Sequence, residues 1–317
     1  MKKNITHEEL LVHIAQDYYY NHLSISEVAR KYQTSRYLIT KYLQRALKNN
    51  VVTIQIHSPY ARNFQLETKF KYLFKIPHIA ILRTNNETNS TETNIVEYAS
   101  QRLQLLIDQS HIIGVTWGNT LHEVIDHFNN ELQEDLVFTQ FMGENMKYNS
   151  QAGTTRMVEN AASHFEAKYI TLPAPLYIVN DKIRKLLPQE PAFKQVMSTA
   201  SKMDLIFCGI GTVSSIDSIP TWHKFKKKIF PGVKTDQIAG MLFGRPYDIN
   251  GNFLLPKKDT VMGITLNQIL STSRRFGVIK SKFKTYSALG ALRGKLLTDI
   301  VMDEGIAQRI LMANSEI

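Results

Sequence analysis

The stretch GVTWGNTLHEVI, residues 114–125, has the pattern of a strand end, a tight turn at a glycine, and a helix start. Backbone N–H groups at a helix N-terminus point outward with the positive end of the helix dipole behind them, so such a turn suits an anion. The pattern alone leaves two alternatives open. The turn belongs either to an enzyme that converts a phosphorylated substrate or to a sensor that only binds one.

Strand-like and helix-like runs alternate from residue 78 onward, which indicates a Rossmann-like α/β domain with a mostly parallel sheet and helices on both faces. Ligands of such sheets lie beyond the carboxyl ends of the strands. The turns Thr116–Gly118 and Gly209–Gly211 are therefore predicted to be walls of one pocket. The predicted strands are 78–83, 111–118, 135–143, 168–178, 203–213 and 297–302, and the predicted helices are 94–107, 120–128, 153–165, 192–202, 285–295 and 304–312.

The composition is that of a globular protein with room for two domains, because 43% of the 317 residues are hydrophobic and 21% are charged. No apolar run reaches the length of about 18 residues that a membrane span needs. Cys208 is the only cysteine, which excludes an internal disulfide and a cysteine-based zinc site. We expect a cytoplasmic chain without a secretion signal, a membrane partner, a metal or a cofactor.

The net charge of +10 is concentrated at the front of the chain. Residues 1–75 carry 12 basic and 5 acidic side chains, whereas the remainder carries 26 and 23. This asymmetry is typical of a small domain that meets a polyanion such as DNA. A basic scaffolding or membrane-surface module is an alternative that explains the charge, but it does not explain the glycine turns.

Three short helices are predicted in this basic region, in the layout of a helix-turn-helix. The first covers 7–22, and the second lies within 23–33 with Ser26 as its N-cap. The third begins after Thr34 or Ser35. Its predicted buried stripe is Leu38, Ile39, Tyr42, Leu43 and Ala46. The turn position where glycine is common holds Gln33, which can adopt a positive φ only at some cost.

The outward side chains of the third helix are the candidate DNA contacts, because the N-terminal end of such a helix faces base edges in the major groove. They combine arginine, which can bind guanine through two hydrogen bonds, with hydroxyl groups and a lysine that suit phosphate. The alternative is a three-helix bundle that does not bind DNA. The predicted DNA-binding residues are Ser35, Arg36, Tyr37, Thr40, Lys41 and Arg45.

The predicted domain organisation is a helix-turn-helix domain over 1–58, a linker helix over 59–76, and an effector domain over 77–317. A β-rich run at 51–59 ends at a proline. The aromatic residues of 63–76 are expected to pack against the other domain or a second subunit. The basic run WHKFKKKIF at 222–230 is interpreted as a solvated surface segment.

An enzyme would need an acid, a base or a nucleophile beside the glycine turns. The titratable candidates near these turns are His122, Glu123, Asp126, Glu144 and Asp204. His122 and Asp126 are four residues apart and are expected to form only a helical side-chain pair. The enzyme alternative, a sugar-phosphate isomerase or deaminase, would need Glu144 over the C1–C2 bond of its substrate. No catalytic residue is predicted.

The order of several stretches resembles the SorC/DeoR-type sugar-binding transcriptional regulators of bacteria over essentially the full chain. The matching stretches are SISEVARKYQTSRYLITKYLQRA, GVTWGNTL, LPAPLYI, DLIFCGIGTV, DINGNF and TYSALGALRGKLLTDIVMDEGIAQRIL. The resemblance implies a helix-turn-helix domain followed by an effector domain related to sugar-phosphate isomerases. It also implies a phosphorylated sugar as inducer and a homodimer or homotetramer on palindromic operator DNA.

The resemblance also implies ligand roles for individual residues. The turn WGNT matches the family's phosphate-holding loop, so Asn119 and Thr120 would bind phosphate. Gln151 matches a polar residue that holds the sugar, and Lys284 matches a lysine that reaches the phosphate. The full predicted effector site is Thr116, Gly118, Asn119, Thr120, Gln151, Gly209, Gly211 and Lys284.

Two positions depart from the family pattern. Met142–Gly143–Glu144 replaces a glycine pair that follows a polar or charged residue, and Met241 stands where an acidic residue is usual. Both departures place apolar side chains where sugar contacts are expected. We therefore expect a transcriptional regulator of a carbohydrate-utilisation operon, controlled by a phosphorylated sugar or polyol whose identity stays open.

Overall fold

The computed structural model describes residues 7–53, 60–83, 88–145, 153–255 and 258–316. The chain divides into two compact units, Met1–Pro59 and Tyr60–Ile317. The run predicted as a strand at 51–59 is not extended at 51–53, and its other residues lie outside the described ones. The helix predicted at 63–76 is α4 (Phe64–Phe74), which is part of the larger unit and buries two of its phenylalanines in the core there.

The smaller unit consists of the helices α1 (His7–Tyr19), α2 (Ile25–Lys31) and α3 (Arg36–Lys48). They enclose a small apolar core made of Ile14, Val28, Ala29, Ile39 and Leu43. The predicted buried stripe of α3 holds for Ile39, Leu43 and Ala46. It is wrong for Leu38, which is 40% exposed, and only half right for Tyr42, which is half-buried.

Serine side chains define where α2 and α3 begin. The N-cap of α2 is Ser24, not the predicted Ser26. The Ser24 hydroxyl accepts from the Glu27 N–H, and the Glu27 carboxylate accepts from the Ser24 N–H, which completes a capping box. Ser35 is the N-cap of α3, as predicted, and accepts a hydrogen bond from the N–H of Leu38 at 3.2 Å. Gln33 lies between them with a φ of +50°, in the left-handed conformation that the predicted turn requires.

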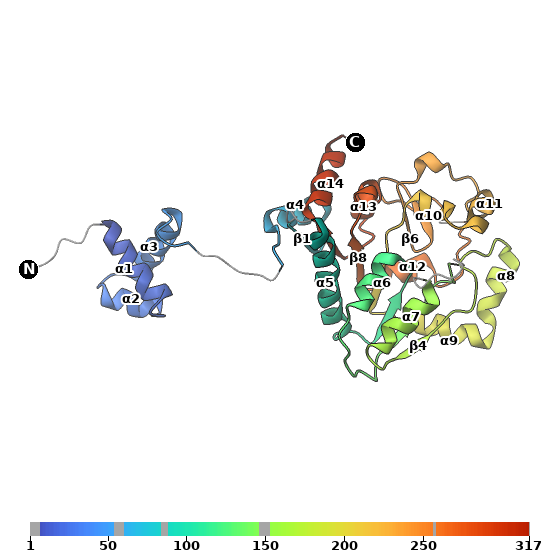
Figure 1. Cartoon of the computed structure of the whole chain (residues 1–317), viewed down its shortest axis with the longest axis horizontal. Helices are drawn as coiled ribbons and strands as arrows, with labels where there is room; N and C mark the ends of the chain where they lie inside the picture. Colours follow the sequence, from blue (N-terminus) through green and yellow to red (C-terminus); the bar gives the residue numbers. More distant parts are fainter. Residues whose placement is uncertain (1–6, 54–59, 84–87, 146–152, 256–257, 317) are drawn as a thin grey trace, which may run out of the picture. The chain divides into compact units, whose positions relative to one another are not determined.

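The larger unit is built on a seven-stranded parallel sheet with the order β1-β9-β8-β5-β2-β3-β4. Figure 1 shows this unit with helices around the sheet. Every neighbouring pair of strands in this sheet is parallel. The strands are β1 (His78–Leu82), β2 (Ile112–Val115), β3 (Val137–Thr139), β4 (Lys168–Ile170), β5 (Leu205–Cys208), β8 (Arg274–Ile279) and β9 (Asp299–Asp303). The α/β prediction is therefore confirmed.

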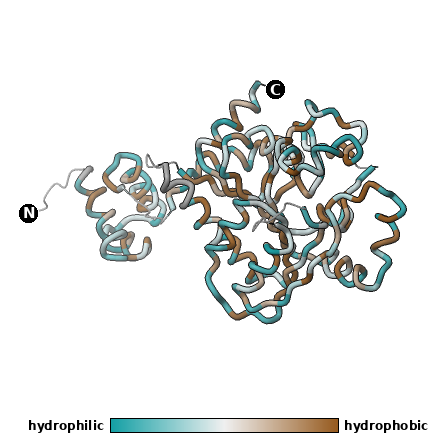
Figure 2. Tube along the Cα trace, turned by 45° about the vertical axis from the view of Figure 1, so that its right-hand side comes forward, coloured by the Kyte–Doolittle hydropathy of each residue, from teal (hydrophilic) through white to brown (hydrophobic). Residues whose placement is uncertain are grey.

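Both faces of the sheet are buried, because each central strand is apolar on both sides. In β5, Leu205 and Phe207 enter one core with α5, α6 and α7, while Ile206 and Cys208 enter the other core with α4, α13 and α14. Figure 2 shows hydrophobic residues running through the interior of the larger unit. None of the described helices is long and apolar enough to cross a membrane.

Helices cover the sheet where the alternation predicted them, and several shorter elements were not predicted. The helices of this unit after α4 are α5 (Thr88–Ile107), α6 (Asn119–Asp126), α7 (Thr154–Ser163), α8 (Asp181–Leu186), α9 (Pro191–Ala200), α10 (Val213–Asp217), α11 (Pro220–Ile229), α12 (Leu266–Ser271), α13 (Thr285–Arg293) and α14 (Glu304–Glu316). The elements not predicted from the sequence are β8, α8, α10, α11, α12, and the hairpin of β6 (Gly240–Leu242) and β7 (Arg245–Tyr247). The strand predicted over 168–178 ends at Ile170, because Pro173 and Pro175 cannot donate to a ladder.

Candidate functional site

The glycine turns after β2 and β5 meet at the point where the chain direction across the sheet reverses. These two strands are neighbours, and from them the chain continues to β3 and β4 on one side and to β8 on the other. Such a switch point is where open α/β sheets bind ligands. A cavity of about 390 Å³ lies there, within the range of small-molecule sites.

The predicted effector residues, apart from Gln151, all line this single cavity. Gln151 lies outside the described residues. The structure thus brings together segments that are up to 168 positions apart in the sequence, the distance from Thr116 to Lys284. The cavity-lining residues from the predicted set are Thr116, Gly118, Asn119, Thr120, Gly209, Gly211 and Lys284.

Thr116 and the two glycines of the second turn hold the cavity walls together. The Gly209 N–H donates to Oγ1 of buried Thr116 at 3.3 Å, and Gly211 exchanges two 2.9 Å backbone hydrogen bonds with Met241. A Cβ at Gly211 would lie 3.2 Å from Cβ of Met241. The N–H groups of both glycines are thus hydrogen-bonded within the protein. The absence of a side chain at these two glycines allows the cavity walls to approach each other closely.

The start of α6 offers the hydrogen-bond donors of this cavity. Gly118 precedes the helix with a φ of +142°, a conformation that side chains rarely adopt, and no side chain caps this end of the helix. The first N–H groups of a helix have no partner within it, so those at Asn119 and Thr120 are available at the cavity wall. Together with the helix dipole they form an anion-binding end.

Two lysines from the segment after β8 reach the same end of the cavity. Lys280 forms an ion pair with Glu123 of α6 at 2.5 Å. Lys284 is half-buried, and its ammonium group makes no hydrogen bond or ion pair with any described residue. Burial, followed by the nearby charge of Lys280, lowers the pKa of Lys284 below its ordinary value. An anion in the cavity would supply the counter-charge that Lys284 lacks.

The other end of the cavity is apolar and aromatic, and sequence reasoning missed most of it. Tyr177 packs edge-on against Trp222 with ring centroids 4.8 Å apart, and its hydroxyl donates to the Gly244 carbonyl at 2.8 Å. Burial raises the pKa of Tyr177. Met142 and Met241, the two positions that depart from the family pattern, also line this cavity.

The basic run at 222–230 is therefore more than a solvated segment. It forms most of α11, whose lysines face outward while Trp222 and Ile229 are buried. The spacing of these two residues, seven positions apart, is the sequence signal for a buried helix face. Lys226 of the same run pairs with Asp217 at 3.2 Å.

The titratable residues that an enzyme would need are engaged in structural contacts. Asp204 precedes β5, at the opposite end of the strand from the cavity, and accepts hydrogen bonds from two backbone N–H groups. His122 and Asp126 form the expected helical pair at 2.5 Å. The carboxylate of Glu144 accepts hydrogen bonds from the N–H groups of Asn145, Thr154 and Thr155 and from the Thr155 hydroxyl. Glu144 thus caps the start of α7.

Replacing Glu144 with glutamine tests this capping role. Because the carboxylate accepts from the α7 N-terminus, the variant is expected to lose about 1–2 kcal/mol of unfolding free energy. Urea unfolding of the full chain measures the loss. Glu134→Gln removes an exposed charge elsewhere and should leave stability unchanged. Equal stability of Glu144→Gln and the wild type would show that Glu144 is free for another task.

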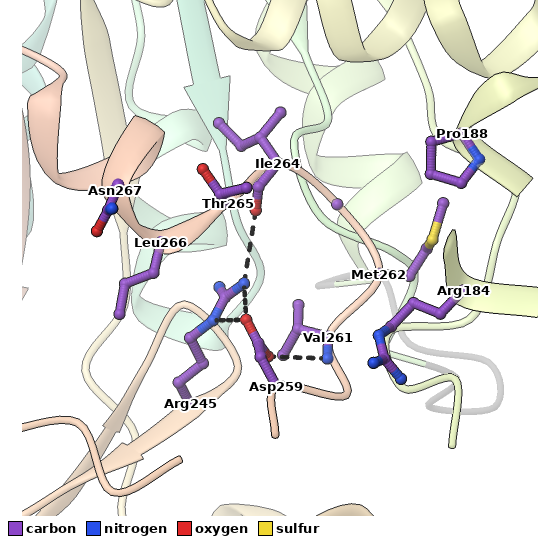
Figure 3. Close-up of a pocket in the computed structure, with 11 residues that line it drawn as sticks. Arg184, Pro188, Arg245, Asp259, Val261, Met262, Ile264, Thr265, Leu266 and Asn267 are labelled. Atoms are coloured by element: carbon purple, nitrogen blue, oxygen red, sulfur yellow. Dashed lines mark hydrogen bonds and ion pairs between the residues drawn. The ribbon is translucent and has the colours of Figure 1, made fainter. Parts of the chain in front are cut away.

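A second cavity, of about 350 Å³, is lined by two arginines, and Figure 3 shows one of them, Arg245, paired with Asp259. Arg245 binds Asp259 at 2.6 Å and donates to the Phe243 carbonyl. Arg184 binds Asp181 and donates to the Ile178 carbonyl. Since both guanidinium groups have internal partners, this cavity offers less to an anion than the one that holds Lys284.

The predicted DNA-binding residues lie on the exposed side of α3, opposite its buried stripe. All of them are exposed, and Tyr37 is 66% exposed. The ammonium group of Lys41 lies 4.9 Å from the centre of the Tyr37 ring. The Thr40 hydroxyl donates to the Arg36 carbonyl at 3.0 Å. Arg36 therefore projects from the first turn of a helix whose outer face is basic.

Known proteins resemble this chain over nearly its full length. The sorbitol operon regulator of Klebsiella pneumoniae is 24% identical over 307 residues, which covers 95% of this chain and 97% of that protein. The deoxyribonucleoside regulator of Bacillus subtilis is 21% identical and covers 96% of this chain and 97% of its own. The crystal structure of full-length SorC from K. pneumoniae matches with a TM-score of 0.68 at 21% identity, over 96% of this chain and 99% of that one.

These similarities confirm the predicted resemblance to SorC- and DeoR-type regulators. The sequence profile of the Sugar-bind family, which describes a sugar-binding domain, matches residues 58–312. That match covers the whole sheet, both glycine turns and the segment that carries Lys284. The chain therefore belongs to the Sugar-bind family of sugar-binding domains.

Proposed function

We propose that this chain is a cytoplasmic DNA-binding transcriptional regulator of a carbohydrate-utilisation operon, controlled by a phosphorylated sugar or polyol. The observation that carries the proposal is the cavity at the switch point, where the uncapped start of α6 and the unpartnered Lys284 face one space. A basic helix-turn-helix precedes it on the same chain. Two relatives that match nearly the whole chain are named as a sorbitol operon regulator and a deoxyribonucleoside regulator.

The phosphate of the effector would bind at the α6 end of the cavity. Asn119 and Thr120 supply backbone and side-chain donors, and Lys284 supplies a full charge in a partly desolvated position. The sugar would then extend toward Tyr177 and Trp222. Stacking of a sugar ring against such aromatic faces leaves its hydroxyls for polar groups at the rim of the cavity. Gln151 stays a proposed contact.

DNA would be bound by α3 in the major groove. Arg36 at its first turn is placed to contact a base edge, while Ser35, Lys41 and Arg45 suit phosphates on either side. We propose that the protein acts as a homodimer or homotetramer, so that two copies of α3 bind the halves of a palindromic operator. The proposed domain boundaries are 1–58 for DNA binding, 59–76 for the linker and 77–317 for effector binding.

The effector would bind one arrangement of the assembly more tightly than another. It would thereby shift the population between them and change the affinity for the operator. The decisive experiment is a thermal-shift screen of the full chain with phosphorylated sugars, each compared with its unphosphorylated parent. The proposal is supported if one phosphorylated compound stabilises the protein and its unphosphorylated parent does not. This stabilisation should grow with the logarithm of the ratio of the compound's concentration to its Kd. The same compound should change the affinity for duplexes selected from a random library. Turnover of that compound without an effect on DNA binding would instead favour an enzyme.

Replacing Arg36 with alanine should weaken binding to the selected duplex by about 1–3 kcal/mol and relax the preference at one base position. Fluorescence anisotropy with matched and mismatched duplexes measures both effects. Gln44→Ala changes another exposed residue of α3 and serves as the control. If Arg36→Ala binds every duplex as the wild type does at moderate salt, α3 is not the recognition helix.

A further inference from the structure

A small cationic cavity lies at the edge of the sheet, away from the proposed effector site. Its volume is about 190 Å³, and α4, β1, β9 and α5 surround it. His78 and Asp299, the first residues of β1 and β9, line it, so it opens toward the amino ends of the strands. The proposed effector cavity lies at the carboxyl ends. The polar residues of the small cavity are Arg62, Lys71, His78, Tyr98, Arg102 and Asp299.

Two described carboxylates, Asp299 in the cavity wall and Glu67 beside Arg62, are already neutralised. Glu67, 3% exposed, binds Arg62 through two hydrogen bonds of 2.8 and 2.6 Å. Asp299, 2% exposed, binds Arg274 through hydrogen bonds of 2.9 and 2.5 Å and accepts another from Thr298. These paired groups cancel one another's charge.

Two cations remain without a counter-charge. Lys71 from α4 and Arg102 from α5 line the cavity, and neither side chain forms a hydrogen bond or an ion pair with any residue that the structure describes. Like charges that share a cavity repel each other, so a bound anion would stabilise this arrangement. The pKa of His78 reports the same surroundings. Burial makes the largest contribution to lowering the pKa of His78. The charge of Asp299 raises this pKa, whereas the charges of Arg274, Arg102 and Lys71 lower it further.

The arginine in the wall is held in a fixed position. The Arg62 guanidinium lies 4.9 Å from the Phe64 ring centre and 5.9 Å from the Tyr98 ring centre. Its N–H groups donate hydrogen bonds to the Glu67 carboxylate. Tyr98 in turn packs edge-on against Tyr60 at 5.4 Å. A rigid wall lowers the entropy cost of binding a small ligand. Lys71 and Arg102 then supply the charge.

We propose that this cavity is a second anion site, which binds a phosphate-type oxyanion from solution independently of the effector. The size supports a small ligand, because 190 Å³ is below the range of about 300–1,000 Å³ for drug-sized molecules. Inorganic phosphate or the phosphoryl group of a small monoester fits this chemistry. The proposal does not depend on the function proposed above.

Phosphate binding can be read at His78 itself. Inorganic phosphate is titrated into the full chain carrying Lys284→Met, which removes one of the two lysines of the larger cavity and leaves Lys280 paired with Glu123, while NMR follows the His78 ring. His78→Gln assigns its signal among the 10 histidines. A saturable shift of the ring signal, with a rise in the pKa of His78 as the anion offsets Lys71 and Arg102, supports the site. A ring that does not respond overturns it.

A charge-matched pair of variants identifies the ligands. Lys71→Gln with Arg102→Gln should weaken the phosphate response at His78 by about tenfold or more for each side chain that binds it. Lys69→Gln with Arg309→Gln removes the same charge from exposed positions outside the cavity and should keep the wild-type response. Equal responses from the two double variants overturn the assignment.

The same variants separate a free anion from a DNA backbone phosphate. A free-anion site predicts that Lys71→Gln with Arg102→Gln binds DNA as its charge-matched control does, with the same salt dependence. A weaker affinity with a shallower salt dependence than the control would assign these cations to DNA phosphates and overturn the free-anion proposal.

Discussion

Replacing Asp17 with alanine is expected to destabilise the helix-turn-helix unit by about 2–3 kcal/mol, because it removes the acceptor of three buried or partly buried hydrogen bonds. Asp17 is 4% exposed and accepts from Lys31 at 2.8 Å, Tyr32 at 2.7 Å and Asn21 at 3.0 Å. The bonds from Lys31 and Tyr32 join α1 to the end of α2, just before the turn at Gln33, and the bond from Asn21 fixes the chain where it leaves α1. A unit of this size has only about 3–7 kcal/mol in total.

Hydrogen exchange of the full chain resolves this loss. Amides of α1 to α3 should exchange about 30- to 160-fold faster in Asp17→Ala, while those of the parallel sheet should not change. DNA affinity should fall with the folded fraction, and the proposed effector should bind as before. Tyr32→Phe, which removes one of the three bonds, should show about a third of the effect. Unchanged protection in α1 to α3 would show that Asp17 does not hold this unit together.

Asp17 also makes the unit sensitive to acid. Burial opposes its charge, but the bonds from Lys31, Tyr32 and Asn21 hold the pKa of Asp17 below its ordinary value of 3.8. A lowered carboxyl pKa stabilises the fold fully above the unfolded pKa, and this stability is lost as the pH falls through the folded pKa. The unit should therefore lose stability below about pH 4 in the wild type, and Asp17→Asn should lack this loss.

The strands and helices that consist of uninterrupted apolar runs could be predicted from the sequence. A strand whose apolar run is interrupted by charged residues was not predicted. The strand β8 begins with Arg274 and Arg275, which argue against a buried strand in a sequence reading. In the structure Arg275 is 8% exposed and donates to backbone carbonyls of Leu270, Thr272, Lys295 and Leu296. Two of these partners, Lys295 and Leu296, are 20 and 21 positions away in the sequence, so no local pattern shows that a buried strand can hold this arginine, and β8 was not predicted.

The polar end of the candidate site could be predicted, but its apolar end could not. A glycine turn after a strand is a local sequence pattern, so Gly118 and Gly209 could be predicted as walls of the cavity. Trp222 and Tyr177 enter the cavity only because α11 and the segment after β4 fold over the sheet. The N-cap of α2 was misplaced for a different reason. The serine three positions before Glu27 is Ser24, and the capping-box spacing would have selected it.

Replacing Lys284 with methionine should weaken the effector response strongly without destabilising the protein. Loss of the only unpartnered lysine among the described residues at the phosphate end should weaken effector binding by about a hundredfold, the order expected for a partly desolvated charged hydrogen bond. Thermal shift with the identified sugar phosphate measures the loss. DNA binding without effector should stay as in the wild type. Lys282→Met, at an exposed neighbouring position, is the control and should respond normally.

The stability of Lys284→Met separates a binding role from a structural one. Burial and Lys280 lower the pKa of Lys284, so its charge costs folding free energy at neutral pH, and this cost disappears as the pH rises through the lowered pKa. The variant should therefore be at least as stable as the wild type near pH 7. Effector binding, which needs the charged lysine, should weaken in the wild type as the pH rises through that pKa, and Lys284→Met should lack this dependence. A destabilised variant that keeps its effector affinity would show that Lys284 supports the fold and does not bind phosphate.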